Sequence, residues 1–317
     1  DRSPSRGLGD VYKRQRLGGI LADDMGLGKT VQALTLLTLL AERGELHRPA
    51  LVIAPTSVIG TWASEAERFA PGLVVRRVEQ TSLRRLALAE AIRGADVVVT
   101  SYTLLRLDAD EFCDTDWSLV LLDEAQFVKN RASKTYQAVR RLRARTKLAM
   151  TGTPLENNLM DLWSILSVTA PGLFPDPKVF DEFYRRPVES GDRERLARLQ
   201  RRLRPLMMRR TKDAVARELP EKQETVVSVP LTADHRRAYD RELQAQRKKV
   251  LGLVGNLGRN RVAVLAALTR LRRLALSPAL VDGGAAVSAK LDALVEMLAE
   301  VTAEGHRALV FSQFTSY

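Results

Sequence analysis

Cysteine, long apolar runs and short repeats are scarce or missing in this sequence of 317 residues. Cys113 is the only cysteine, so the chain can form no internal disulfide, and a zinc site is disfavoured. No stretch approaches the roughly 18 uninterrupted apolar residues of a membrane span. The first residues also lack the apolar core of a signal peptide, and no short-period repeat is visible. These absences argue against a membrane-spanning or disulfide-stapled secreted protein and favour a cytoplasmic one.

What is present is an ordinary globular composition with an excess of positive charge. Hydrophobic residues make up 45% and charged residues 28% of the chain, which suits a buried core shared by roughly two domains. The formal net charge of +12 at pH 7 favours a polyanionic partner, with nucleic acid preferred over a membrane surface. Residues 1–15 show no hydrophobic period, and we expect them to be a disordered tail that is foreign to the natural protein.

The stretch from Gly18 to Thr30 predicts a phosphate-binding loop. Residues 19–22 are typical of a short buried strand, a glycine turn follows, and residues 31–41 are typical of an apolar helix. A strand, a glycine turn and Gly-Lys-Thr at a helix start together cradle the phosphates of nucleoside triphosphates. The candidate nucleotide-binding residues are therefore Asp23, Asp24, Met25, Gly26, Leu27, Gly28, Lys29 and Thr30.

Several members of this loop have a predicted role. Gly26 and Gly28 let backbone N–H groups approach phosphate oxygens. Lys29 can reach the terminal phosphates, and the hydroxyl of Thr30 is the expected ligand of Mg²⁺. The general pattern has glycine where this sequence has Asp23. Taken alone, the stretch could also be a glycine turn that caps an ordinary helix.

Four further apolar runs end in polar residues. The runs span residues 50–54, 96–100, 119–122 and 147–150, and the polar residues that come after them include Thr56, Ser57, Ser101, Tyr102, Asp123, Glu124, Thr151 and Thr153. Short apolar strands separated by helices predict an α/β fold with a parallel sheet that is covered on both faces. Ligands of such sheets bind beyond the carboxyl ends of the strands, so we expect one shared site. Residues 308–311 predict another buried strand, at the start of a second α/β domain.

Asp123 and Glu124 supply the carboxylates that a triphosphatase needs. Mg²⁺ prefers carboxylate oxygens beside the phosphates, which is the predicted role of Asp123. Hydrolysis also requires a group that orients and deprotonates the attacking water, and the adjacent Glu124 suits that role. The alternative is a helix start decorated with acidic residues. The presence of both this pair and the phosphate-binding loop favours the catalytic interpretation.

Thr151, Gly152 and Thr153 come directly after the last of these strands. They could form a plain turn before a helix, with Thr153 as its cap. Their predicted position beside the nucleotide suggests instead a coupling element that senses the phosphates and signals to a neighbouring lobe. Gln126 could likewise contact the terminal phosphate or its attacking water.

Three of these segments resemble a known family. Asp24–Thr30, Asp123–Gln126 and Thr151–Asn157 are similar to motifs I, II and III of the Swi/Snf-type helicase-like ATPases of superfamily two. Outside them, Pro55–Ser57 with Trp62 is similar to motif Ia, and residues 206–212 and 310–314 resemble later blocks. The resemblance covers about residues 17–317, and an aspartate at position 23 is usual for the family.

The resemblance implies two RecA-like lobes that bind ATP with Mg²⁺ between them, and helical protrusions inserted in the chain. Residues 16–170 would form the P-loop lobe, 171–228 a first protrusion and connector, 229–285 a second protrusion, and 286–317 the truncated start of the second RecA-like lobe. The arginines that reach across to the terminal phosphate would lie beyond Tyr317. Such an arginine contributes on the order of 10³–10⁵ in rate, so we expect these residues alone to hydrolyse ATP hardly at all.

The implied activity is ATP-driven translocation along double-stranded DNA, which remodels protein–DNA complexes. The resemblance implies Thr56, Ser57, Ser101 and Tyr102 as contacts of the phosphate backbone, which carry no sequence information and weaken as salt rises. One alternative is a strand-separating RNA or DNA helicase. Another is a nucleotide-dependent module that remodels a protein partner such as RNA polymerase.

Overall fold

The computed structural model describes residues 18–152, 158–215, 218, 223–251, 257–283 and 288–317. The chain divides into two compact units, Asp1–Pro220 and Glu221–Tyr317. All the strands in the described part of the chain belong to the first unit, and the second contributes helices. Of the helices described, none combines the length and the apolarity needed to cross a bilayer.

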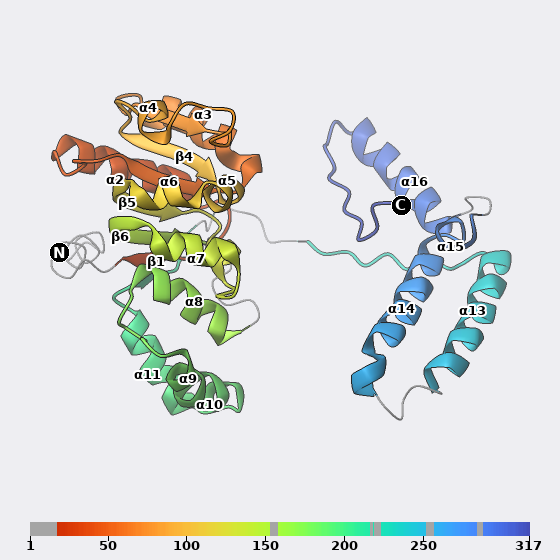
Figure 1. Cartoon of the computed structure of the whole chain (residues 1–317). Helices are drawn as coiled ribbons and strands as arrows, with labels where there is room; N and C mark the ends of the chain where they lie inside the picture. Colours follow the sequence, from red (N-terminus) through yellow and green to blue (C-terminus); the bar gives the residue numbers. More distant parts are fainter. Residues whose placement is uncertain (1–17, 153–157, 216–217, 219–222, 252–256, 284–287) are drawn as a thin grey trace. The chain divides into compact units, whose positions relative to one another are not determined.

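A parallel sheet forms the centre of the described first unit (Figure 1). It has seven strands in the order β3-β4-β2-β5-β6-β1-β7. Its strands are β1 (Gly19–Leu21), β2 (Ala50–Ala54), β3 (Val75–Val78), β4 (Val97–Ser101), β5 (Asp116–Leu122), β6 (Arg143–Met150) and β7 (Met207–Met208). β2 and β4 are buried along their whole length, as their continuous apolar sequences require. Every pairing is parallel, so the carboxyl ends share one edge and the predicted parallel sheet is confirmed.

Helices cover both faces of this sheet, and the residues of each strand alternate between the two cores. In β2, Leu51 and Ile53 enter one core, whereas Val52 enters the other together with Leu37 and Trp62. The helices on the Val52 face are α2 (Lys29–Glu42) and α3 (Ile59–Phe69), the latter preceded by a 3₁₀ turn, η1 (Thr56–Val58). Those on the opposite face are α4 (Leu88–Ala91), α5 (Tyr102–Leu107), α6 (Ala109–Asp114), α7 (Lys134–Arg141) and α8 (Leu159–Thr169).

A helical excursion leaves the sheet after β6 and returns to it at β7. After α8 it comprises α9 (Pro177–Phe180), a π-helical segment η3 (Asp181–Arg185), α10 (Arg186–Glu189) and α11 (Arg193–Leu203). Its core is aromatic, since Phe174 packs edge-on against Phe180 and Tyr184 with ring centroids 5.0 and 5.5 Å apart. The guanidinium carbon of Arg195 lies 3.8 Å from the ring centroid of Phe183, so this arginine partly covers the aromatic residues.

The second unit contains an antiparallel pair of helices, α13 (Ala233–Leu251) and α14 (Leu257–Leu276). The pair is joined by a hydrogen bond between His235 Nε2 and the Leu274 main-chain oxygen (2.6 Å) and by an ion pair between Arg270 and Glu242 (2.6 Å). The shorter α15 (Ala279–Asp282) and then α16 (Ala289–Ala303) come next. The hydroxyl of Ser288 accepts a hydrogen bond from the Leu291 N–H at the start of α16.

The buried strand predicted over residues 308–311 is wrong. This segment belongs to no strand, and Leu309 and Phe311 are 86% and 88% exposed. An apolar segment becomes a strand only when a neighbouring strand satisfies its backbone, and all the strands described belong to the first unit. Two strands were not predicted from apolar runs: the edge strand β3, whose central residues are two arginines, and the two-residue β7.

Candidate nucleotide-binding and catalytic site

The loop between β1 and α2 has the geometry of an anion cradle. Gly26 and Gly28 have φ angles of 86° and 70°, which L side chains adopt only with strain. No side chain in the described residues caps the start of α2, so its first N–H groups face the ligand position. Met25 is exposed, and Leu27 and Thr30 are half-buried, which leaves the loop open to a nucleotide.

Lys29, the first residue of α2, points back over the loop. Its Nζ donates to the main-chain oxygens of Asp23 (2.8 Å) and Asp24 (3.2 Å). Gly152, just after β6, approaches it closely: a Cβ added to Gly152 would lie 3.7 Å from Lys29 Nζ and 3.0 Å from Met25 Cγ. The ammonium group therefore lies where the ends of β1 and β6 meet, on carbonyl oxygens that a phosphate could replace.

The carboxylate of Asp23 is fully buried and serves as an anchor. It accepts hydrogen bonds from Arg210 through the main-chain N (2.9 Å), Nε (3.0 Å) and Nη2 (2.5 Å), and from Gln32 Nε2 (3.2 Å). Burial by itself would raise the pKa of the Asp23 carboxyl, but the hydrogen bonds from Arg210 and Gln32 outweigh burial and lower this pKa. The residue that replaces glycine in the general loop pattern thus fixes the loop to a segment almost 190 residues away.

That segment, residues 207–212, runs alongside the phosphate-binding loop. The N–H groups of Ala22 and Asp24 donate to the main-chain oxygens of Met208 (2.7 Å) and Arg210 (3.0 Å), and the Lys212 N–H donates to Asp24 Oδ2 (3.0 Å). The segment continues into α12 (Lys212–Val215). The end of the helical excursion therefore holds the outer side of the loop.

Asp123 lies directly after β5, at the same edge of the sheet as Lys29. Its Oδ2 accepts a hydrogen bond from Trp62 Nε1 (2.8 Å), and its Oδ1 accepts one from the Glu124 N–H (3.0 Å). Its main-chain oxygen accepts a hydrogen bond from the Tyr102 hydroxyl (2.7 Å). Burial raises the pKa of the Asp123 carboxyl, as does the charge of Glu124, whereas the Trp62 hydrogen bond and the charge of Lys29 act in the opposite direction.

Glu124 is the one non-glycine residue among those described that has a positive φ, at 48°. A left-handed conformation in a non-glycine residue costs on the order of 1–3 kcal/mol, and such residues cluster at functional sites. Glu124 directly precedes the 3₁₀ turn η2 (Ala125–Val128), so the left-handed residue lies where the chain turns away from the end of β5.

A chain of side-chain hydrogen bonds joins the end of β5 to the end of β6. Gln126 Nε2 donates to Glu124 Oε2 (2.8 Å), and the hydroxyl of Thr151 donates to Gln126 Oε1 (3.0 Å). Thr151 is fully buried. The structure therefore brings together Glu124, Gln126 and Thr151, which the sequence analysis had assigned to catalysis and coupling. Thr153, the third predicted coupling residue, lies outside the described residues.

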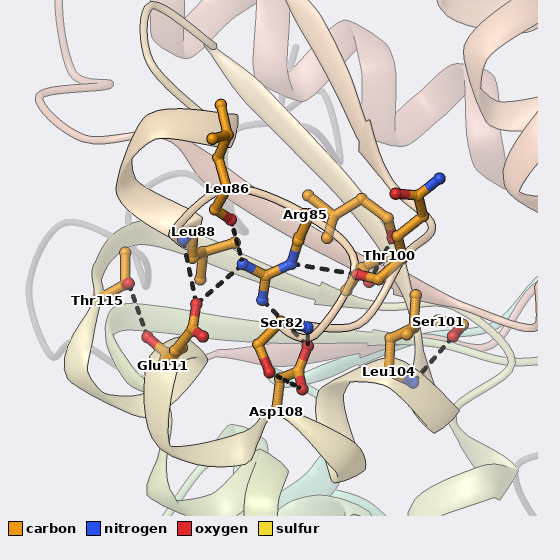
Figure 2. A network of polar contacts seen from close by, with 12 residues as sticks. Ser82, Arg85, Leu86, Leu88, Thr100, Ser101, Leu104, Asp108, Glu111 and Thr115 are labelled. Atoms are coloured by element: carbon orange, nitrogen blue, oxygen red, sulfur yellow. Dashed lines mark hydrogen bonds and ion pairs between the residues drawn. The ribbon is translucent and has the colours of Figure 1, made fainter.

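The four predicted DNA contacts fall into two pairs. Thr56 and Ser57 are exposed in the turn after β2. Ser101 and Tyr102 are only 3% and 4% exposed. The hydroxyl of Ser101 accepts a hydrogen bond from the Leu104 N–H (3.0 Å) at the start of α5 (Figure 2). The burial of Ser101 and Tyr102 and the bond of the Tyr102 hydroxyl to Asp123 argue against their predicted contact with DNA, whereas Thr56 and Ser57 stay predicted contacts.

Figure 2 also shows a buried ionic network that the sequence analysis did not predict. Arg85, whose side chain is 8% exposed, forms ion pairs with Asp108 (3.0 Å) and Glu111 (2.9 Å). Glu111 also accepts a hydrogen bond from the Leu88 N–H (3.1 Å), and Asp108 accepts two from Ser82. This network fixes the connection between β3 and α4 onto α6.

The oxygen donors of the site suit Mg²⁺. No group of three or more histidine, cysteine or acidic residues in the described chain could hold a metal ion by itself. Mg²⁺ is typically held by one or two protein oxygens together with phosphates and water, and Thr30 and Asp123 supply such oxygens. Each carboxylate oxygen of Asp123 has one donor among the described residues, so lone pairs remain for a cation.

Three parts of the site have roles in the structure that the sequence did not predict. Trp62 and residues 206–212 were noted only as parts of family blocks, and Tyr102 was assigned to DNA. Because the carboxyl ends of parallel strands share one edge, acids and hydroxyls after the strands are expected there. This does not indicate which side chain from a neighbouring helix will contact them. These contacts join residues 61 and 187 positions apart, and they become visible only in the folded chain.

Comparison with known proteins agrees with this geometry. The model of the SNF2-related domain family matches residues 8–280. The provisionally assigned ATP-dependent helicase/translocase YwqA of Bacillus subtilis (strain 168) is 36% identical to this chain over 312 residues. The match covers 94% of this chain and 33% of YwqA. The mouse chromodomain-helicase-DNA-binding protein 1-like is 35% identical over 94% of this chain and 34% of its own length.

Solved structures agree with the sequence comparisons. The SWI2/SNF2 ATPase core of Sulfolobus solfataricus in complex with double-stranded DNA is similar with a TM-score of 0.58 and 32% identity. The match covers 95% of this chain and 63% of that one. The chain spans about a third of the length of the curated relatives it matches.

Proposed function

The chain belongs to the SNF2-related family, and from that membership we propose that it is part of an ATPase that moves along double-stranded DNA and remodels protein–DNA complexes. The observation that carries the proposal is that Lys29, Asp123 and Glu124 converge at one edge of the sheet. Glu124 is also joined to Thr151 through Gln126. A cation-binding acid, a water-activating acid and a phosphate-binding lysine are what triphosphate hydrolysis requires.

The phosphate-binding loop contributes binding and orientation. The N–H groups at the start of α2 and the Lys29 ammonium group would hold the terminal phosphates of ATP. In the structure Lys29 rests on the oxygens of Asp23 and Asp24. ATP binding would exchange those contacts for phosphate oxygens. Asp23 and Arg210 would hold the loop in shape during the exchange.

Glu124 is the proposed general base for the attacking water. Its carboxylate is held by Gln126, which in turn is held by the buried Thr151, so its position depends on the end of β6. Thr30 and Asp123 would hold Mg²⁺, which neutralises charge that develops on the phosphates. The family resemblance implies that arginines of a second lobe would complete the site.

We propose double-stranded DNA as the track. The net charge of +12 suits a polyanion. A similar solved structure is a complex with double-stranded DNA, and Thr56 and Ser57 are exposed at the sheet edge. Phosphate contacts of this kind provide grip without sequence preference, as a translocating enzyme needs.

The test uses protein from the full reading frame that encodes this chain. ATP turnover is measured with double-stranded DNA, single-stranded DNA and RNA, with Glu124→Gln as the inactive control. Stimulation by duplex DNA, with displacement of a third strand from an uninterrupted duplex, supports the proposal. Unwinding of a tailed duplex would favour a strand-separating helicase, and turnover that responds only to a protein such as RNA polymerase would favour a protein remodeller.

A further inference from the structure

Asp123 is held by two aromatic side chains that come from two neighbouring strand ends. Trp62 lies in α3, which begins after the turn that ends β2, and donates to Asp123 Oδ2 (2.8 Å). Tyr102 is the first residue of α5, directly after β4, and donates to the Asp123 main-chain oxygen (2.7 Å). β4, β2 and β5 are adjacent in the sheet, so three consecutive strand ends are tied together at this carboxylate.

We propose that Trp62 and Tyr102 are positioning residues that hold Asp123 in its cation-binding geometry. In this proposal Trp62 also connects the DNA-facing turn at Thr56 and Ser57 to Asp123. Both halves of this inference rest on the proposed function. The first assumes that Asp123 holds Mg²⁺, and the second also assumes that the turn contacts DNA.

The connection from the turn to Trp62 is short and stiff. The 3₁₀ turn η1 is followed directly by α3, which begins at Ile59. Trp62 lies one helical turn further on and is 1% exposed, with Ile59 and Ala66 beside it in the core. Close-packed cores transmit small displacements instead of absorbing them. A shift of the turn on DNA would therefore move Trp62 Nε1, and with it Asp123 Oδ2.

Tyr102 braces the backbone that carries both acids. Its hydroxyl holds the main-chain oxygen of Asp123, and its ring stacks on Phe127 with centroids 5.1 Å apart and an interplanar angle of 9°. Between these two contact points lies Glu124 in its left-handed conformation. Such a conformation persists only where its surroundings hold it, and Tyr102 supplies part of that support.

The first experiment measures how Mg²⁺ changes the affinity of the 317-residue chain for a fluorescent ADP, without DNA. Trp62→Phe and Tyr102→Phe keep an aromatic ring and remove one donor each. Residues that orient a metal ligand typically contribute 10–100-fold in metal affinity. We expect Trp62→Phe to lower the magnesium-dependent gain in affinity on the order of tenfold, with the magnesium-free affinity unchanged, and Tyr102→Phe to lower it less.

The chain offers matched controls for both variants. Trp117 Nε1 donates to the Phe112 main-chain oxygen (2.9 Å) and Tyr136 Oη is hydrogen-bonded to Ser167 Oγ (2.8 Å), both from buried side chains of the first unit. Trp117→Phe and Tyr136→Phe remove equivalent groups away from Asp123 and should leave the magnesium-dependent gain intact. An unchanged gain in Trp62→Phe, or an equal loss in Trp117→Phe, would overturn the positioning role.

The second experiment uses protein from the full reading frame, adds a DNA duplex and measures the factor by which the duplex changes the affinity for the magnesium nucleotide. In the parent protein we expect this factor to differ from one. It should return toward one in Trp62→Phe and keep the parent value in Trp117→Phe. The reverse measurement, of DNA affinity with and without nucleotide, must give the same factor. If the parent protein does not bind DNA, the proposed function fails and the link to the turn fails with it. If it binds DNA with a factor of one, or shows a factor that Trp62→Phe leaves unchanged, the link is wrong while the proposed function stands.

Discussion

The ion pair between Asp23 and Arg210 gives the sharpest prediction about stability. The Asp23 carboxylate is fully buried, whereas the Arg210 side chain is 43% exposed. Breaking a buried pair by removing one partner typically costs about 3–5 kcal/mol. In Arg210→Met the carboxylate keeps the Gln32 amide and the main-chain N–H of residue 210. Because of this, and because Arg210 is partly solvated, we expect a smaller cost of about 2–3 kcal/mol.

The assay is a double-mutant cycle with Asp23→Asn, Arg210→Met and the double variant. All three tryptophans (Trp62, Trp117 and Trp163) lie in the first unit, so their fluorescence in a urea titration reports its unfolding. We expect a coupling energy of about 2 kcal/mol at pH 7. An equivalent cycle on the exposed pair Arg77 and Glu79, which are 3.8 Å apart, should give about 0–0.5 kcal/mol.

The pH dependence of this coupling has a definite sign. The pKa of Asp23 is lowered in the folded chain because the hydrogen bonds from Arg210 and Gln32 outweigh burial. Its contribution is therefore complete above the unfolded carboxyl pKa of about 3.9 and is lost as the pH falls through the folded value. A coupling energy near zero at pH 7, or one that grows below pH 4, would refute the anchoring role of Asp23.

The structure gives three further expected outcomes. Burial lowers the pKa of Lys147 to about 8 from its ordinary 10.5, so between pH 8 and 10.5 the unfolded state binds more protons than the folded state. The free energy of unfolding should therefore rise over this range by up to about 3 kcal/mol. Lys147→Met should remove this rise in urea titrations. Arg85→Met removes the cation that pairs with Asp108, whose side chain is 6% exposed. This should lower the free energy of unfolding of the first unit by about 3–5 kcal/mol. A change below about 1 kcal/mol would contradict the network in Figure 2. Finally, the logarithm of the DNA association constant should fall linearly with the logarithm of the salt concentration, and salt-independent binding would contradict phosphate contacts.

The sheet and its polar edge could be predicted because they depend on local sequence. The apolar runs at 50–54, 119–122 and 147–150 need burial on both faces, and parallel pairing then places the polar residues after each run on one edge. The roles of Asp123 and Glu124 can be inferred from the chemistry of carboxylates beside phosphates. None of these steps requires knowledge of a contact between distant residues.

The supports of the site could not be predicted in this way. Asp23 appeared as a departure from the general loop pattern, and its physical reason, Arg210, lies beyond the entire helical excursion. Tyr102 has the polar hydroxyl expected of a DNA contact, but the folded chain buries it against Asp123. The apolar segment at 308–311 could not become a strand without a partner in the described second unit.

The proposed function requires one magnesium-bound triphosphate to touch both the phosphate-binding loop and the end of β5. The most direct measurement is the affinity of the chain for a fluorescent ATP analogue, with and without Mg²⁺, in the parent, Lys29→Ala and Asp123→Asn. We predict that Lys29→Ala weakens binding under both conditions and that Asp123→Asn loses only the magnesium-dependent gain. A magnesium-dependent gain that survives unchanged in Asp123→Asn would contradict the shared site.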